Sequence, residues 1–172
     1  MNELALLMNI LSTRKNSIQI GASEEEVLER LDIKYRNNSI YFQQLIIELS
    51  KHLEPLGMQV RYNPLNSCWF ITFDNEVSDL TSANPFNERP SLAATLYCVI
   101  IYCLKSSGKT KISEIQKVRN VKHLVNDLRE LESLGYIELN QDKGWVNLTP
   151  LIGYKLDIPK LLLNSSLRVK EL

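Results

Sequence analysis

Hydrophobic residues recur along the chain at spacings that predict the same series of elements twice. In the first half, these spacings predict a helix over 4–11, a brief strand over 18–20 and a longer helix over 39–52. Between them, Ser23 and Glu26 have the spacing of a capping box, in which each residue satisfies a free backbone donor of the other at a helix start. The longer helix carries one apolar stripe, which consists of Phe42, Leu45, Ile46, Leu49 and Leu53.

A β-hairpin is expected to close this first series. Two β-prone runs over 58–62 and 68–73 alternate between apolar and polar residues, and a polar turn joins them. The residues that follow are rich in Asn, Ser, Asp and Pro, which is typical of a linker. We therefore expect a first domain at 1–76 and a linker at 77–90.

The second series begins with an almost wholly apolar helix, predicted over 92–104. A short strand over 110–112 follows, then a short helix that Ser113 is expected to cap, and a longer helix over 122–133. A second hairpin over 136–149 completes the series.

Two details make the parallel between the halves specific. The sequence at the end of each long helix is Leu-Glu-x-Leu-Gly, at 53–57 and at 131–135, and Trp69 and Trp145 open the second strand of each hairpin. The order helix, strand, helix, helix, hairpin is that of a winged helix. We therefore expect an α+β, predominantly helical fold with two tandem winged-helix domains, the second at 91–150 and followed by a C-terminal extension at 151–172. A single unrelated α+β domain with two hairpins is the alternative.

Composition fits a soluble globular protein. The 172 residues are 44% hydrophobic and include 20 basic and 20 acidic residues, so the formal net charge is zero. That balance excludes a protein that is basic over its whole surface. The longest apolar run, at 92–104, is shorter than the roughly 20 residues that span a bilayer. Arg14 and Lys15 follow the first apolar stretch instead of preceding it, so we expect no secretory signal, no membrane contact and a cytoplasmic location.

Residues with catalytic or metal-binding potential are few and poorly spaced. Cys68, Cys98 and Cys103 form no Cys-x-x-Cys pair, and neither His52 nor His123 has a cysteine at metal-ligand spacing. The chain also lacks a phosphate-binding glycine loop and a nucleophile elbow. We expect buried or half-buried thiols, no catalytic residues, no metal, no cofactor and no small-molecule substrate, although carboxylates brought together by the fold would escape this reasoning.

Charge is distributed unevenly between the halves. Residues 1–76 contain 7 basic and 10 acidic residues, a net charge of −3, which leaves +3 for the remainder. Between positions 105 and 123 six basic residues stand against Glu114 alone. These residues are candidates for phosphate contact by a helix-turn-helix, although a solvated surface without a partner is slightly favoured. They are Lys105, Lys109, Lys111, Lys117, Arg119 and Lys122.

The second half resembles a known family. The sequence from Pro90 to Leu96, followed by Ile100-Ile101-Tyr102, is similar to the start of the second winged helix in segregation and condensation protein B. The run from Ile112 to Val121 resembles that family's Ile-x-x-Ile-x-x-Ile-Arg-Gly-Val sequence, with Asn120 in place of the glycine and a longer preceding turn. The family's leucine-rich helix and Gly-Leu-Ile sequence are matched by Leu128, Leu131, Leu134, Gly135, Tyr136 and Ile137.

This resemblance implies a non-enzymatic accessory subunit of the kite type. Such proteins dimerise through winged-helix units and bind the middle of a kleisin, which bridges the heads of an SMC ATPase in chromosome condensation and segregation. The implied partners are a kleisin-like protein, an SMC-type ATPase complex and a second copy of the chain. The implied location is nucleoid-associated, with DNA contact weak or indirect.

Binding a polypeptide requires exposed apolar surface more than a charged groove. Candidates lie on the first helix, on the third helix and in the apolar tail, although a tail of this kind more often covers its own domain's core. They are Leu4, Leu7, Leu11, Tyr41, Phe42, Tyr154, Leu161 and Leu162. The alternative function is a winged-helix DNA-binding transcriptional regulator that uses the basic residues above. A general-transcription-factor subunit shares features of both functions.

Overall fold

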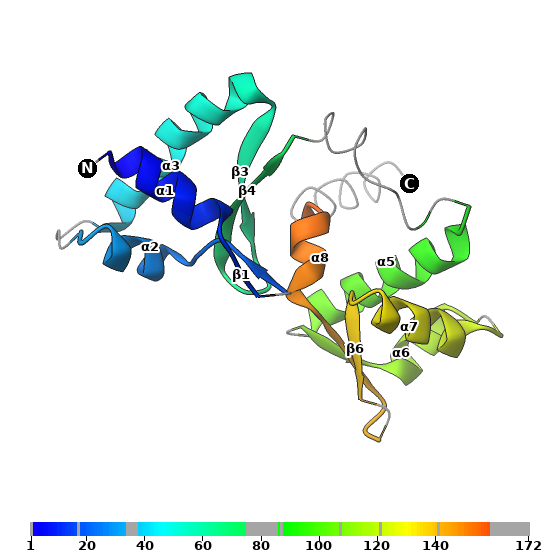
Figure 1. Ribbon diagram of the computed structural model, residues 1–172. Helices are drawn as coiled ribbons and strands as arrows, with labels where there is room; N and C mark the ends of the chain where they lie inside the picture. Colours follow the sequence, from blue (N-terminus) through cyan, green and yellow to red (C-terminus); the bar gives the residue numbers. More distant parts are fainter. Residues whose placement is uncertain are drawn as a thin grey trace, which may run out of the picture. The chain divides into compact units, whose positions relative to one another are not determined.

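The protein consists of two compact units (Figure 1). The first contains Met1–Ala83 together with Leu156–Leu172, and the second contains Asn84–Lys155. The computed structural model describes residues 2–16, 18–33, 38–74, 86, 88–106, 108–120, 122–140 and 142–158. The division between the units falls inside the expected linker at 77–90, most of which lies outside the described residues.

The first unit contains helices and a wing hairpin in the expected order. In chain order these are α1 (Glu3–Ser12), β1 (Arg14–Asn16), β2 (Gln19–Ile20), α2 (Glu24–Arg30), α3 (Asn38–Leu53), the 3-10 turn η1 (Glu54–Leu56), β3 (Met58–Asn63) and β4 (Cys68–Phe73). The third helix ends because Pro55 enters the 3-10 turn, and Gly57 then adopts a left-handed conformation with φ 66°.

The core of the first unit lies between α1, α2 and α3. Its buried residues are Leu7, Ile10, Leu11, Ala22, Val27, Ile33, Phe42, Leu45, Ile46, Leu49 and Leu53. Trp69 on the wing packs edge-on against Phe42, with ring centroids 5.6 Å apart. The hairpin therefore contributes an aromatic side chain to the same core as the apolar stripe of α3.

A close backbone approach joins the strand region of the first unit to its wing. Ala22 and Trp69 exchange two backbone hydrogen bonds of 2.8 and 3.1 Å. At Gly21, with φ 77°, a Cβ atom would lie 1.9 Å from the Trp69 carbonyl oxygen. Only glycine fits at this position, because both the backbone conformation and the available space exclude a side chain.

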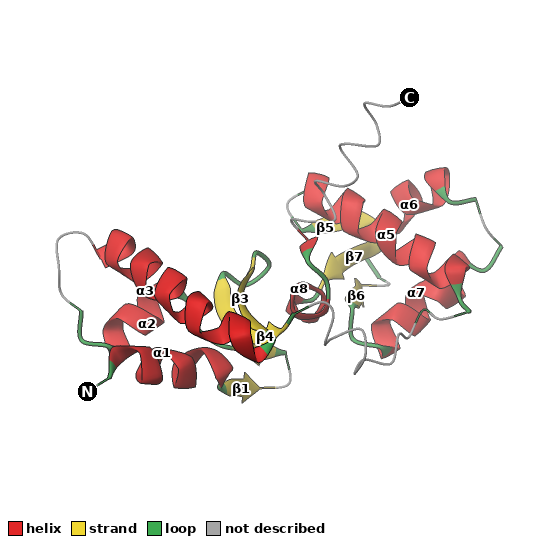
Figure 2. Ribbon diagram, turned by 90° about the horizontal axis from the view of Figure 1, so that it is seen from above, coloured by secondary structure: helices red, strands yellow, loops and turns green. Residues whose placement is uncertain are grey.

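The second unit repeats the arrangement (Figure 2). Its elements are α5 (Pro90–Lys105), β5 (Lys109–Lys111), α6 (Ile112–Val118), α7 (Leu124–Ser133), β6 (Ile137–Asn140), β7 (Trp145–Leu148) and α8 (Pro150–Lys155). Strand β5 pairs with β7 so that Lys111 lies opposite Trp145, as Ala22 lies opposite Trp69 in the first unit. Each unit is thus a winged helix, and the α+β, predominantly helical fold with two tandem winged-helix domains is confirmed.

Helix α5 passes through the core of the second unit, as its apolar circumference indicates. Leu92, Leu96 and Ile100 are buried, and Val99 and Cys103 are completely buried. Gly135 adopts a left-handed conformation with φ 78° after α7, as expected for a helix stop.

Two expectations about element ends differ from the structure. Ser113 does not cap α6, because the helix already begins at Ile112, whose backbone N–H donates to the Gly144 carbonyl at 2.9 Å. Residues 151–155, expected within a C-terminal extension, belong to helix α8 of the second unit, where Ile152 is fully buried.

Candidate interaction surfaces

The described residues contain no group of three or more His, Cys, Asp or Glu side chains that is arranged to hold a metal ion. Cys68 and Cys103 are buried, and Cys98 is partly buried. Burial raises the pKa of the Cys103 thiol to about 12, against smaller opposite effects of backbone hydrogen bonds. This thiol therefore behaves as a small hydrophobic residue and is unsuited to act as a nucleophile. No helix among the described residues has the length and apolarity needed to cross a membrane.

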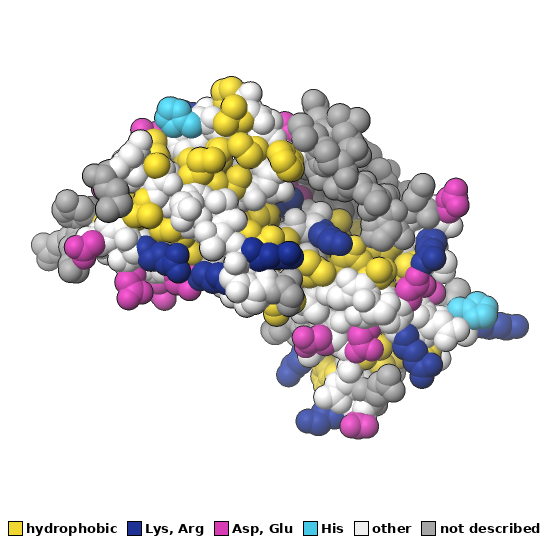
Figure 3. Space-filling model, viewed as in Figure 1, with side chains coloured by type: hydrophobic (Ala, Val, Ile, Leu, Met, Phe, Trp, Pro, Cys, Tyr) yellow, Lys and Arg dark blue, Asp and Glu magenta, His cyan; other side chains and the backbone are white. Residues whose placement is uncertain are grey.

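Five of the six basic residues predicted as phosphate contacts have exposed side chains. They are Lys105, Lys109, Lys111, Lys117 and Lys122. On the face seen in Figure 3, acidic and uncharged side chains separate the basic side chains of the second unit. They form no continuous basic stripe on that face.

Lys109 and Lys111 lie beside the tryptophan of the second wing. Each ammonium nitrogen is 5.6 Å from the centroid of the Trp145 ring, a distance typical of a cation–π contact. The two lysines are separated by one residue on β5, so their side chains project from the same face of the sheet. This pair places two positive charges beside one aromatic ring.

Arg119 has an internal role instead of the predicted phosphate contact. Its Nε donates to Thr95 Oγ1 at 2.7 Å, and its Nη2 donates to the backbone carbonyl and the hydroxyl oxygen of Ser91 at 2.7 and 2.8 Å. Thr95 Oγ1 in turn donates to Asp127 Oδ2 at 2.8 Å. This network joins α5, the end of α6 and α7, so the guanidinium is occupied within its own unit.

Helix α7, in the position of a recognition helix, presents a mixed outer face. Val125, Asn126 and Arg129 are exposed, whereas Glu130 forms an ion pair with Arg89. The helix follows Lys122 and His123, both exposed, but its own outer face combines one basic residue with apolar and amide side chains.

Several predicted partner contacts are part of the core and require correction. Leu7, Leu11 and Phe42 are 0% exposed, because they pack together between α1 and α3. Tyr154 on α8 is also buried, at 8% exposure. These four side chains are therefore buried in their own units and do not present a contact surface to a partner. Leu161 and Leu162 lie outside the described residues.

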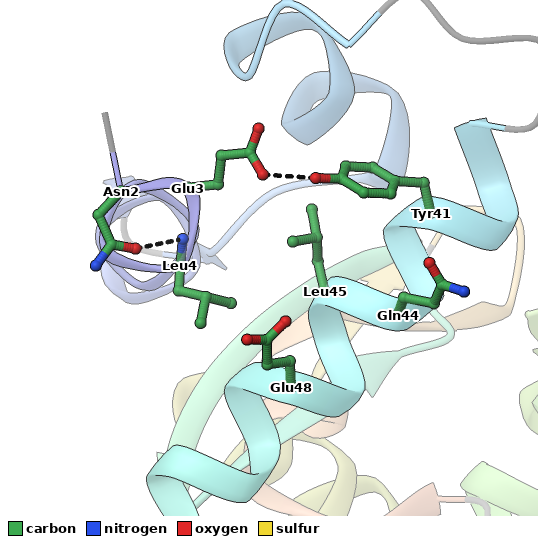
Figure 4. A pocket seen from close by; sticks show the side chains of 7 residues that line it. All are labelled: Asn2, Glu3, Leu4, Tyr41, Gln44, Leu45 and Glu48. Carbon is green, nitrogen blue, oxygen red and sulfur yellow. Dashed lines mark hydrogen bonds between the residues drawn. The ribbon is translucent and has the colours of Figure 1, made fainter.

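The two remaining candidates, Leu4 and Tyr41, line the same shallow pocket between the start of α1 and the outer side of α3 (Figure 4). Its volume is about 400 Å³. Among the described residues, its lining consists of Asn2, Glu3, Leu4, Tyr41, Gln44, Leu45 and Glu48. The Tyr41 hydroxyl donates to Glu3 Oε2 at 2.5 Å, which fixes one carboxylate at the rim.

The outer face of α3 continues from this pocket and carries two exposed isoleucines. Ile40 is 62% exposed and Ile47 is 55% exposed. Together with Gln44, Glu48 and Lys51 they occupy one side of the helix, because their spacing follows the helical period. We call these five residues the α3 face. Sequence patterns predict this surface only weakly, because an exposed isoleucine cannot be distinguished from a core isoleucine until the neighbouring elements are placed.

Comparisons with known proteins give similarities in structure alone. No protein-family model matches the chain, and a sequence search of curated proteins finds no match. A crystal structure of ScpB from Mycobacterium tuberculosis aligns over 86% of this chain and 88% of its own, with 12% identity and a TM-score of 0.33. A conserved hypothetical protein from Chlorobium tepidum aligns over 90% of this chain and 96% of its own, with 14% identity and a TM-score of 0.37. At these TM-scores neither similarity establishes a family or a function.

Proposed function

We propose that the chain is a non-enzymatic kite-type accessory subunit, which dimerises and binds a kleisin in an SMC-type chromosome condensation and segregation complex. The α3 face is the observation that carries this proposal. In a DNA-binding winged helix the corresponding face enters the major groove and needs cationic or hydrogen-bonding side chains. Here the α3 face carries one basic, one acidic and one amide side chain together with the exposed Ile40 and Ile47, and these two isoleucines favour contact with a polypeptide.

The sequence resemblance of the second half supports the same function. The matched residues from Leu92 to Ile137 include the elements α5, α6 and α7, and the Ile112–Val121 run contains Arg119 of the internal network. The resemblance implies that the partners are a kleisin and an SMC-type ATPase. It also implies that the chain forms a homodimer. The proposed location is the cytoplasm, in association with the nucleoid.

A second candidate function is a winged-helix DNA-binding transcriptional regulator. The specific observation in its favour is the lysine pair beside Trp145, because lysines interleaved with an aromatic ring suit a phosphate backbone. Against it stand the internal role of Arg119 and the mixed outer face of α7.

Affinity capture tests the proposed function. The full chain, tagged and expressed in its native host, is purified with and without nuclease treatment, and the bound chains are identified by mass spectrometry. We expect an SMC-type ATPase and a kleisin-like chain to be retained after nuclease treatment, because polypeptide contacts hold them. Absence of an SMC-type ATPase would overturn the proposal, and loss of all bound chains on nuclease treatment would favour the DNA-binding candidate.

A further inference from the structure

The pocket between α1 and α3 combines an apolar floor with an acidic rim. Leu4 from α1 and Leu45 from α3 supply the apolar surface (Figure 4). Glu3 and Glu48 supply carboxylates from the two helices, and none of the seven described lining residues is basic. The first 76 residues also carry a net charge of −3, although Lys51 lies three residues beyond Glu48 on the α3 face.

This pocket matches the shape and charge of a long basic side chain. The aliphatic stem of a lysine or arginine packs against leucines, while its charged head needs carboxylate acceptors and contact with water. One acceptor is already oriented, because the Tyr41 hydroxyl donates to Glu3 Oε2 at 2.5 Å and leaves the other oxygen of that carboxylate available to a ligand.

The α3 face extends this site beyond a single side chain. Gln44 and Glu48 belong both to the pocket lining and to the α3 face. Ile40 and Ile47 lie beside them at 62% and 55% exposure. A ligand that fills the pocket with a cation is therefore well placed to cover two exposed isoleucines along the same helix.

We propose that the pocket and the α3 face together bind an amphipathic helix of the partner polypeptide, whose apolar stripe covers Ile40 and Ile47 and whose Lys or Arg enters the pocket between Glu3 and Glu48. This inference rests on the proposed function and specifies the chemistry of the partner segment. Helix-in-groove recognition supplies the apolar anchors, and the acidic rim selects for a basic partner.

A charge-swap experiment on the full chain tests this site. The probes are two synthetic amphipathic helical peptides with the same leucine stripe, one flanked by lysines and the other by glutamates, with binding followed by fluorescence anisotropy. We expect the lysine peptide to bind about tenfold more tightly than the glutamate peptide, and Glu48→Lys to reverse that preference. Ile47→Ser should weaken both peptides.

Matched variants control for net charge and for apolar area. Glu29→Lys makes the same charge change at an exposed position of α2 in the same unit, and Leu56→Ser removes an exposed leucine from the turn η1. Both should bind the lysine peptide like the wild type, and circular dichroism checks that every variant is folded. Equal affinities for the two peptides, or equal effects of Glu48→Lys and Glu29→Lys, would overturn the inference.

Affinity capture with the Glu48→Lys variant separates this inference from the proposed function. If both are right, the variant loses the kleisin-like chain that the wild type and Glu29→Lys retain. If the variant retains it at the wild-type level, the proposed function stands and the binding site is wrong. If the α3 face instead binds a second copy of the chain, Ile47→Ser converts a dimer to a monomer in sedimentation, which also overturns the inference.

Discussion

At the scale of single residues, the Arg119 guanidinium links the helices of the second unit. It makes three hydrogen bonds to Thr95 and Ser91 on α5, and the Thr95 hydroxyl in turn donates to Asp127 on α7. Hydrogen bonds that involve a charged group stabilise a fold by about 1.5–3 kcal/mol each, more than neutral ones. The network therefore fixes the position of α7 relative to the long core helix.

Replacing this side chain should destabilise the second unit. We expect Arg119→Ala to lower its free energy of unfolding by about 2 kcal/mol, because Thr95 and Ser91 lose their donor. The measurement is urea denaturation followed by Trp145 fluorescence in a Trp69→Phe background. Lys117→Ala, on the exposed side of α6, is the matched control and should change stability by less than about 0.5 kcal/mol. If both variants lost a similar amount of unfolding free energy, the hydrogen-bond network would stabilise the unit no more than an exposed side chain does.

Residue roles were the hardest feature to predict from the sequence. Counting charges identified the basic cluster at 105–122 but treated all six members alike, because the partners of Arg119 lie 24 and 28 residues away. Helical spacing likewise placed Leu4, Leu7 and Leu11 together. The structure separates them, since Leu4 lines the pocket and the other two are fully buried.

At the scale of elements, the start of α2 shows how a local sequence fixes a helix end. Ser23 Oγ accepts from the Glu26 backbone N–H at 3.3 Å, and Glu26 Oε2 accepts from the Ser23 N–H at 3.0 Å, so the predicted capping box is confirmed. The other Glu26 oxygen accepts from Lys15 Nζ at 2.5 Å. The hydrogen bonds from Lys15 and from the Ser23 backbone lower the pKa of the Glu26 carboxyl below its usual value of 4.5. The hydrogen bond from Lys15 has the larger effect.

The capping interaction should therefore depend on pH. A carboxyl whose pKa is lower in the folded state stabilises the fold above its unfolded pKa, and that contribution is lost as the pH falls through the folded value. We expect wild type to exceed Glu26→Gln in stability at neutral pH by at most about 1 kcal/mol, because both side chains of the Lys15–Glu26 pair are partly exposed to solvent. The difference should vanish as the pH falls below 4.5.

Urea denaturation at several pH values, followed by Trp69 fluorescence in a Trp145→Phe background, measures this difference. Glu25→Gln is the control, since Glu25 is exposed in the same helical turn outside the capping box. A constant difference between wild type and Glu26→Gln down to acidic pH would contradict the assignment.

Long amphipathic elements were predictable because each carries its own period. Helix α3, expected over 39–52, spans Asn38–Leu53, and both hairpins match within a residue or two. The short strands were harder to predict from the sequence. Strand β1 has only three exposed residues, and the pairing of β5 with β7 depends on a contact between residues more than 30 positions apart, which no local pattern encodes.

At the scale of the whole molecule, one fold is used twice with different outer surfaces. The α3 face of the first unit exposes two isoleucines and adjoins an acidic pocket, whereas the second unit presents lysines around Trp145. The charges of the two halves, −3 and +3, follow the same division. The duplication could be predicted from the repeated Leu-Glu-x-Leu-Gly sequence and tryptophan positions. The difference between the two surfaces could not, because it depends on where the fold places each side chain.

The central claim is that these winged helices bind polypeptides in preference to a phosphate backbone. Titration of the full chain with a labelled DNA duplex, at about 50 mM and about 200 mM salt, tests it most directly. We predict weak binding at the lower salt concentration that hardly responds to the double charge reversal Lys109→Glu and Lys111→Glu. Tight binding that falls by about a thousandfold between the two salt concentrations, and that the double reversal abolishes, would contradict the claim.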